Sequence, residues 1–149
     1  MSRLDKHEQI TSAHQARPYP ALTPSTAGFW ESGREGVLSI KRCEACARFH
    51  HPPMVYCPYC LSTETRFETV SGYAALASYT VNHHSWHPAF TAPYILAIVE
   101  LREATDIRLT TRLVDLAPDQ VRIGMMLKVV FEKVGPAWLP LFGPGTADE

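Results

Sequence analysis

The four cysteines of this chain lie in two Cys-x-x-Cys pairs, Cys43 with Cys46 and Cys57 with Cys60. Each pair can place two thiolates on one turn of backbone, and the short segment between the pairs can fold one turn against the other. Four thiolates satisfy the tetrahedral coordination of zinc in structural sites. The spacing therefore predicts a zinc ribbon with a closed coordination shell, which would support the fold and leave no open position for catalysis.

Two other interpretations of these cysteines are reduced thiols without a metal and a pair of disulfides. The range 1–10 is polar and lacks the apolar stretch of a secretory signal, so it does not indicate an oxidising compartment. Metal binding is therefore the interpretation that we favour. Ala47 and Leu61 follow the two pairs, at positions where zinc turns often carry glycine because the backbone there can need a positive φ. We expect both turns to tolerate the absence of glycine.

Several further side chains are candidates for contact with a partner or a ligand. Aromatic residues in a predicted short helix either pack on the ribbon, which we favour, or anchor a partner. Aromatic residues on a long loop over 82–93 are harder to assign to a core, and such residues often mark a binding surface. Basic residues just before the first cysteine belong either to a solvated face of mixed charge, which we favour, or to a site for a nucleotide phosphate. These candidates are Phe29, Trp30, Lys41, Arg42, Trp86 and Phe90.

The histidines offer weaker signals. His50 and His51 follow the first cysteine pair, but no thiolate is missing from the zinc site, so we expect both side chains at the surface. His83, His84 and His87 lie together in the loop over 82–93, and no carboxylate stands beside them. We favour solvated loop histidines over a second metal site.

The elements that must position these residues are mainly strands. A short helix is expected over 25–36, capped by Ser25 or Thr26, and a strand over 37–41 leads into the first cysteine pair. From residue 67 onward the apolar residues alternate as in strands, and the range 94–101 is apolar on both faces, as in a central strand. Four or five antiparallel strands fit a small closed barrel, for which the OB-fold is the natural candidate. The expected strands are 73–81, 94–101, 107–113 and 127–133, with a hairpin link over 103–106, a helical turn over 118–121, and the range 138–142 sealing the barrel bottom or contacting another subunit.

The composition is that of a globular protein, with 46% hydrophobic and 19% charged residues in 149. A net charge of -1 argues against bulk attraction to the phosphates of nucleic acid. Because no apolar run is long enough to cross a bilayer, we expect a soluble cytoplasmic protein without membrane contact. We divide the chain into a tail or strap over 1–24, the short helix over 25–36, the ribbon over 37–68, the barrel over 69–143 and a tail over 144–149. The strap is either disordered or lies on a partner.

Catalytic patterns are absent from the sequence. It contains no G-x-S-x-G, no H-E-x-x-H, no phosphate-binding glycine loop and no dinucleotide fingerprint. We expect no enzyme activity from the chain alone, although a partner enzyme can require it.

The order of motifs resembles a known family. The motifs are F-W-E-S-G, C-E-A-C, H-P-P-M-V-Y-C-P-Y-C, S-G-Y-A-A-L-A-S-Y-T-V, A-P-Y-I-L-A-I-V-E-L, R-L-T-T-R-L-V and I-G-M-M-L-K-V-V-F-E, over residues 23–142. Together they resemble the zinc-ribbon plus OB-fold family of acyl-CoA-associated accessory proteins, long classed as a domain of unknown function. The resemblance implies an N-terminal helical segment, a rubredoxin-like ribbon and a C-terminal OB barrel. It also implies a role in lipid metabolism, in association with thiolase-like enzymes, synthases, hydratases or aldolases that act on acyl-CoA thioesters.

Our first hypothesis is therefore a non-catalytic accessory subunit that binds such an enzyme and also the acyl-CoA, with the oligomeric state left open. The second is a single-stranded nucleic-acid-binding module that uses the barrel face and the ribbon. Its weakness is that Arg108 and Arg112 are opposed by carboxylates such as Glu100 and Glu132, which leaves no net positive field. The third is a metal-dependent hydrolase built on the three loop histidines.

Overall fold

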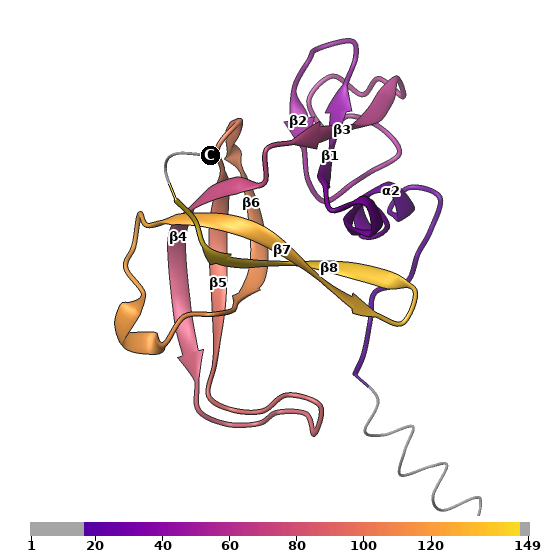
Figure 1. Ribbon diagram of the computed structural model, residues 1–149. Coiled ribbons are helices and arrows are strands. Elements are labelled where there is room, and N and C mark those ends of the chain that lie inside the picture. The colour runs from indigo at the N-terminus through magenta and orange to yellow at the C-terminus, as the bar shows by residue number, and fades with distance from the viewer. Residues whose placement is uncertain (1–16, 147–149) are drawn as a thin grey trace, which may run out of the picture.

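The computed structural model describes residues 17–146, as a short helical segment followed by a small sheet and a barrel (Figure 1). The expected tail segments over 1–16 and 147–149 lie outside the described residues. The small sheet has the strand order β2-β1-β3, and the closed barrel has the order β4-β5-β6-β8-β7. The elements are α2 (Ala27–Trp30), the 3-10 helix η1 (Ser32–Glu35), β1 (Leu38–Cys43), β2 (Phe49–His50), β3 (Thr65–Val70), β4 (Tyr73–Asn82), β5 (Tyr94–Leu101), β6 (Ala104–Leu113), the 3-10 helix η2 (Pro118–Gln120), β7 (Met126–Val134) and β8 (Ala137–Pro144).

The alternation of residues in the barrel strands explains its core. Successive side chains of a strand point to opposite faces, so every second residue of β5 is buried, as at Ala97 and Val99. Leu96 and Ile98 point outward and are each 38% exposed. Strand β5 pairs with β4 on one side and with β6 on the other, which confirms the expected central strand. The mainly β fold class is likewise confirmed.

The range 138–142 does more than seal the barrel. It forms most of β8, which pairs antiparallel with β7 and meets β6 in parallel at Leu113 and Phe142. Phe142 is fully buried, and its strand closes the barrel. The sequence concealed this strand because Pro140 cannot donate a ladder hydrogen bond. The Pro140 carbonyl instead accepts a hydrogen bond of 2.8 Å from the Thr111 hydroxyl.

The hairpin between β5 and β6 is tighter than expected. Its turn is made by Arg102 and Glu103 alone, because β6 already begins at Ala104. The Glu103 carboxylate accepts a hydrogen bond of 2.7 Å from the backbone N–H of Ser71. This bond ties the hairpin to the short connection between the ribbon and the barrel.

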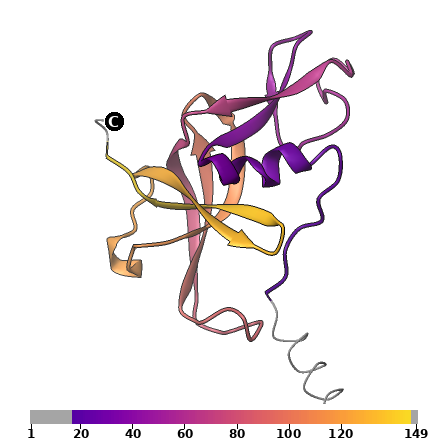
Figure 2. The ribbon, with the colours of Figure 1, turned by 45° about the vertical axis from the view of Figure 1, so that its right-hand side comes forward.

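Helix α2 and η1 lie between the small sheet and the β7–β8 hairpin in both views (Figure 2). Two glycines permit this close packing. A Cβ on Gly28 would lie 2.3 Å from the Phe67 ring, and a Cβ on Gly33 would lie 2.4 Å from the Phe131 ring. Thr26 occupies the N-cap position as expected, but its side chain makes no capping hydrogen bond to the helix.

The described part of the strap, residues 17–22, follows the chain's own barrel. Tyr19 packs on Gly135 in the turn between β7 and β8, where an added Cβ would lie 2.7 Å from the Tyr19 ring. Arg17 forms an ion pair with Glu132 on β7. Residues 17–22 are therefore placed on this chain's own barrel, an arrangement that neither expectation for the strap included. No helix among residues 17–146 is long and apolar enough to cross a membrane.

Candidate metal centre and contact surfaces

The sulfur atoms of the four cysteines converge at the tip of the small sheet. All four lie within 4.8 Å of one another, and the Sγ–Sγ distances are 3.6 Å for Cys43–Cys60 and 3.6 Å for Cys46–Cys57. Tetrahedral zinc with Zn–S bonds of about 2.3 Å needs sulfurs roughly 3.8 Å apart, whereas a disulfide bond is about 2.0 Å long. The cysteines are free thiols, and their arrangement fits a tetrahedral metal ion.

Both cysteine turns adopt the backbone conformation that the sequence indicated. Ala47 has φ 61° and Leu61 has φ 62°, which is the left-handed region where glycine is usual. Backbone N–H groups point to the sulfurs, with 3.5 Å from Cys46 N to Cys43 Sγ and 3.4 Å from Tyr59 N to Cys57 Sγ. Such donors stabilise thiolates over thiols. The turns are therefore shaped to present negatively charged sulfur.

The pKa values of two of the thiols, Cys57 and Cys60, differ strongly. Burial raises the pKa of Cys57, but hydrogen bonds from the backbone N–H groups of Tyr59 and Cys60 outweigh it and, with the neighbouring thiols, lower that pKa to about 7. The backbone at Ser62 lowers the pKa of Cys60, but desolvation and the other three thiols raise it to about 12. The thiols thus compete for negative charge, and a divalent cation would favour deprotonation of all four.

The three loop histidines do not form a second centre. Among the residues that the structure describes, the four cysteines are the only group of three or more metal-binding side chains that converge. The His84 ring packs against Trp86 at 4.8 Å, and His87 Nδ1 accepts a hydrogen bond of 3.1 Å from Ala89 N. The described residues therefore provide no histidine metal site for the hypothesis of a metal-dependent hydrolase.

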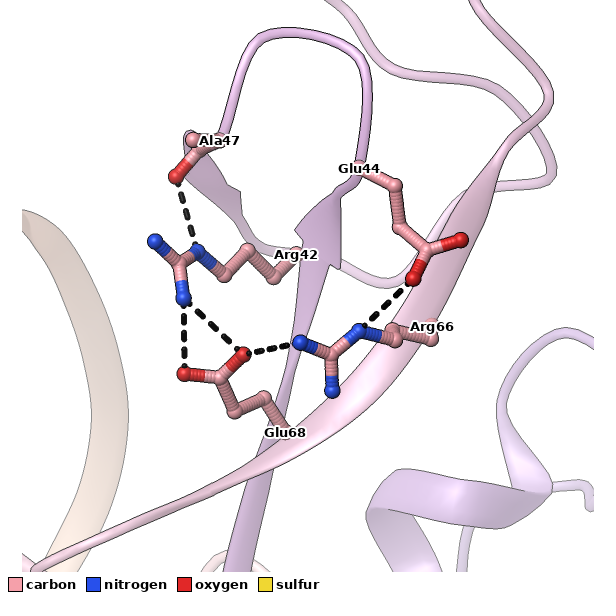
Figure 3. Close-up of polar contacts among 5 residues, drawn as sticks. All are labelled: Arg42, Glu44, Ala47, Arg66 and Glu68. Carbon is pink, nitrogen blue, oxygen red and sulfur yellow. Dashed lines mark hydrogen bonds and ion pairs between the residues drawn. The ribbon is translucent and has the colours of Figure 1, made fainter.

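A ladder of alternating charge covers one face of the small sheet (Figure 3). The Arg42 guanidinium donates to both carboxylate oxygens of Glu68, at 2.9 and 3.0 Å, and its Nε donates to Ala47 O at 2.9 Å. Arg66 bridges Glu68 and Glu44, each at 3.0 Å. Arg42, a candidate for phosphate contact, therefore fixes the first cysteine turn and is already neutralised by carboxylate.

Lys41 and its neighbours lie inside the protein. Lys41 is only 9% exposed, and its ammonium donates to Met54 O at 3.0 Å and lies 5.3 Å from the Phe67 ring centroid. His50, paired with Lys41 across the sheet, is 2% exposed, so its expected surface position is wrong. His51 packs 4.8 Å from Phe29, and burial lowers its pKa to about 4. Burial also lowers the pKa of His50.

The aromatic candidates fall into two groups. Trp86 is 75% exposed at the loop tip, and Trp30 is half-buried at the edge of a hollow. Phe29 is 3% exposed in the core, and Phe90 is half-buried beneath the Arg17 guanidinium. The structure therefore leaves the two tryptophans better placed for a partner than the two phenylalanines.

The hollow beside Trp30 contains residues that the sequence reasoning missed. It has a volume of about 220 Å³ and lies between α2, the ribbon and the barrel. Its barrel side is mostly apolar and is supplied by Leu109, Thr110, Thr111, Leu139, Pro140 and Leu141. The alternation of residues along β6 places Thr110 on the outer face of the barrel. The remaining residues on the barrel side of the hollow come partly from β8, which the sequence did not reveal as a strand.

Opposite charges pair over the barrel as well. Arg108 donates to Glu100 at 2.7 Å, and Arg112 donates to Glu132 at 2.8 Å. The expected balance of charge on this surface is therefore realised as ion pairs, which leaves these arginines without excess positive potential.

The fold and the four-sulfur centre define a rubredoxin-like ribbon joined to an OB-fold barrel. Family models match both parts, as "ChsH2, rubredoxin-like zinc ribbon domain" over residues 30–66 and "ChsH2, C-terminal OB-fold domain" over residues 67–132. The chain belongs to this ChsH2-type DUF35 family, as its resemblance in sequence predicted.

Its relatives include subunits and scaffold proteins. A probable enoyl-CoA hydratase alpha subunit of Thermomonospora curvata is 40% identical over 99% of this chain, which spans only 46% of that relative. A DUF35 domain-containing scaffold protein of Methanothermobacter thermautotrophicus is 35% identical over 65% of this chain and 73% of the relative. A solved structure described as Ltp2-ChsH2(DUF35) aldolase has a chain with a TM-score of 0.77 and 38% identity, covering 86% of this chain and 100% of that one.

Proposed function

We propose that this protein is a non-catalytic accessory subunit that binds an acyl-CoA-processing enzyme in the cytoplasm. The observation that carries the proposal is the likeness, at 38% identity over the full matched chain, to a DUF35 protein described together with Ltp2 as an aldolase. Relatives named as a hydratase alpha subunit and as a scaffold protein support the same role. A thiolase-like enzyme, a synthase or a hydratase is the partner class that we propose.

The two exposed or half-exposed tryptophans are the proposed contact residues. Trp86 offers a large apolar side chain on a loop, and tryptophan is among the residues that most often dominate binding energy at interfaces. Trp30 and Phe29 line the apolar hollow of about 220 Å³, which is suited to the pantetheine or acyl part of a thioester. Phe90 contributes to the contact surface indirectly, because its ring packs beneath the Arg17 guanidinium in the loop that carries Trp86. The partner would supply the chemistry.

Phosphate contacts from Lys41 and Arg42 are the weaker part of the proposal. Lys41 would have to share its ammonium between Met54 O and the phosphate, and Arg42 would have to release Glu68. The CoA phosphates are therefore better held by the partner, with this chain holding the apolar part.

Zinc is the proposed ion of the four-cysteine centre, because four thiolates at tetrahedral spacing suit it and leave no ligand position for water. Its role is structural. It fixes the cysteine turns, the first of which follows β1. Arg42 connects this first turn to the charged ladder, because its Nε donates to Ala47 O. Metal analysis of the purified protein should give one zinc per chain.

The alternative is a module for single-stranded nucleic acid. The exposed Trp86 ring could stack on a base, as aromatic side chains do in such proteins. The ion pairs over the barrel oppose it, because they remove the positive groove that follows a phosphate backbone. Tight, salt-sensitive binding of a single-stranded oligonucleotide would favour this alternative over the accessory role.

Co-expression with the enzymes encoded beside its gene tests the accessory role. We expect the chain to co-purify with a thiolase-like enzyme, synthase or hydratase, and that enzyme to turn over its acyl-CoA faster in the complex. The isolated chain should show no turnover. A lone chain that consumes a thioester, or neighbouring enzymes that neither bind it nor respond to it, would contradict the proposal.

A further inference from the structure

Arg17 connects the strap (residues 17–22) to the loop that carries Trp86. A guanidinium N–H of Arg17 donates to Glu132 on β7, and the same guanidinium lies 5.4 Å from the centroid of the Phe90 ring. The Arg17 side chain is 19% exposed, so both contacts are largely shielded from water. One arginine thus joins the strap, the loop and the barrel, which are far apart in the sequence.

The barrel holds Arg17 in a fixed place. The second oxygen of Glu132 accepts a hydrogen bond of 2.8 Å from Arg112 on β6, so the carboxylate that binds Arg17 is itself fixed. A second contact fastens the strap nearby, where Tyr19 packs on Gly135 at the end of the β7–β8 hairpin. The strap is therefore attached at two points, and Arg17 approaches the loop from a rigid base.

The loop end of this connection is a compact unit. The Phe90 ring packs 5.7 Å from His87 and 6.0 Å from Tyr94, the first residue of β5. Two backbone donors close the turn, with 2.9 Å from Phe90 N to His87 O and 3.1 Å from Ala89 N to His87 Nδ1. Trp86 directly precedes this unit and packs 4.8 Å from the His84 ring, so the unit anchors one end of the backbone that carries the exposed indole.

We propose that Arg17 is a latch, a positioning residue that holds the range 87–94 against the barrel and so fixes the direction of Trp86. The attraction between a guanidinium and an aromatic face supplies the contact, and the Glu132 carboxylate orients it. A partner would then meet Trp86 in a preorganised position and would not have to order the loop. The latch is a property of the isolated chain and goes beyond the proposed accessory role.

Hydrogen exchange of the full chain tests the latch, because the amides of Ala89, Phe90 and Ala92 donate to His87 and Ser85 within the same loop. In Arg17→Gln we expect these amides to exchange roughly 3- to 10-fold faster, the factor that loss of one shielded cation–π contact allows. Amides of β5 and β6 should be unchanged. Arg34→Gln removes the same charge from an exposed residue of η1 and is the matched control.

A double variant decides whether the effect passes through the aromatic ring. Phe90→Leu should accelerate the loop amides by itself, and adding Arg17→Gln to it should then have no further effect. The proposal is overturned if Arg17→Gln exchanges like Arg34→Gln. It is overturned as well if Arg17→Gln accelerates the barrel amides as much as the loop, because Arg17 would then be a general stabiliser. Co-purification with a partner is not needed for either outcome.

Discussion

The ring of Phe67 on β3 occupies the space that a side chain on Gly28 would need. A Cβ on Gly28 would lie 2.3 Å from Phe67 Cδ2, and the Lys41 ammonium lies 5.3 Å from the centroid of the same ring. Helix α2 therefore touches the ribbon with its backbone. The placement of the helix, and with it the hollow beside Trp30, depends on an ordered ribbon.

Replacing Gly28 tests this contact. We expect Gly28→Ala to lower the free energy of unfolding by about 1–3 kcal/mol, because the Phe67 ring must leave its packed position. Alanine's better helix propensity offsets only part of this loss. Urea unfolding at a fixed excess of zinc measures the difference in unfolding free energy between wild type and Gly28→Ala. In a Phe67→Leu background the same substitution should cost less, and an equal cost in both backgrounds would show that the ring is not the cause.

Removing the metal should disorder the ribbon before the barrel. The cysteine turns place Ala47 and Leu61 at positive φ and crowd four sulfurs together, so the metal ion must offset these costs. Treatment with a strong chelator, or Cys57→Ser, should abolish slow hydrogen exchange over 43–61 while β5 amides stay protected. Ser62→Ala, beside the same centre, is the control and should keep its metal. Ribbon amides that remain protected without metal would refute the structural role.

Acidification should destabilise the fold through His51. Burial lowers its folded-state pKa to about 4, against 6.5 for the unfolded chain, so the unfolded state binds more protons between these values. Stability is complete above pH 6.5 and falls by up to about 3 kcal/mol as pH drops toward 4. The difference in unfolding free energy between wild type and His51→Gln should show this dependence, since metal loss affects both. His84→Gln, on the loop, should behave as wild type.

Truncating Trp86 should weaken partner binding and leave the chain itself intact. We expect Trp86→Ala to raise the Kd for the partner enzyme by roughly 30-fold, equivalent to about 2 kcal/mol, as for a central aromatic anchor. Thermal unfolding of the isolated variant should match wild type, because the side chain is 75% exposed. Ile123→Ala, 62% exposed, is the control. Titration calorimetry measures the Kd of both variants for the partner enzyme. An unchanged Kd for Trp86→Ala would show that this residue is not part of the interface.

The metal centre and most of the barrel could be predicted because local chemistry determines them. Four thiolates at that spacing have few uses, and the alternation of apolar residues reports which face of a strand is buried. The 3-10 turn η2 falls inside the helical turn that Pro118 indicated. These features depend on neighbours in the sequence.

The rest depends on contacts between distant segments. His50 looks like a surface residue until the ribbon packs against the rest of the chain, and no local pattern reports that burial. Trp86 and Phe90 look alike in the sequence, yet Arg17 covers one of them and leaves the other in solvent. Strand β8 was hidden by Pro140, which cannot donate a ladder hydrogen bond, and its place in the barrel also depends on pairing with β6, which is distant in the sequence.

The position of β8 has a consequence for how the barrel folds. Strand β8, the last among the described residues, inserts between β6 and β7, which both precede it. Until β8 pairs, the partly folded barrel has two open edges whose backbone groups are unpaired, and such edges attract other chains. Closure of the barrel therefore waits for β8, and a chain that lacks this strand would expose both edges to other chains.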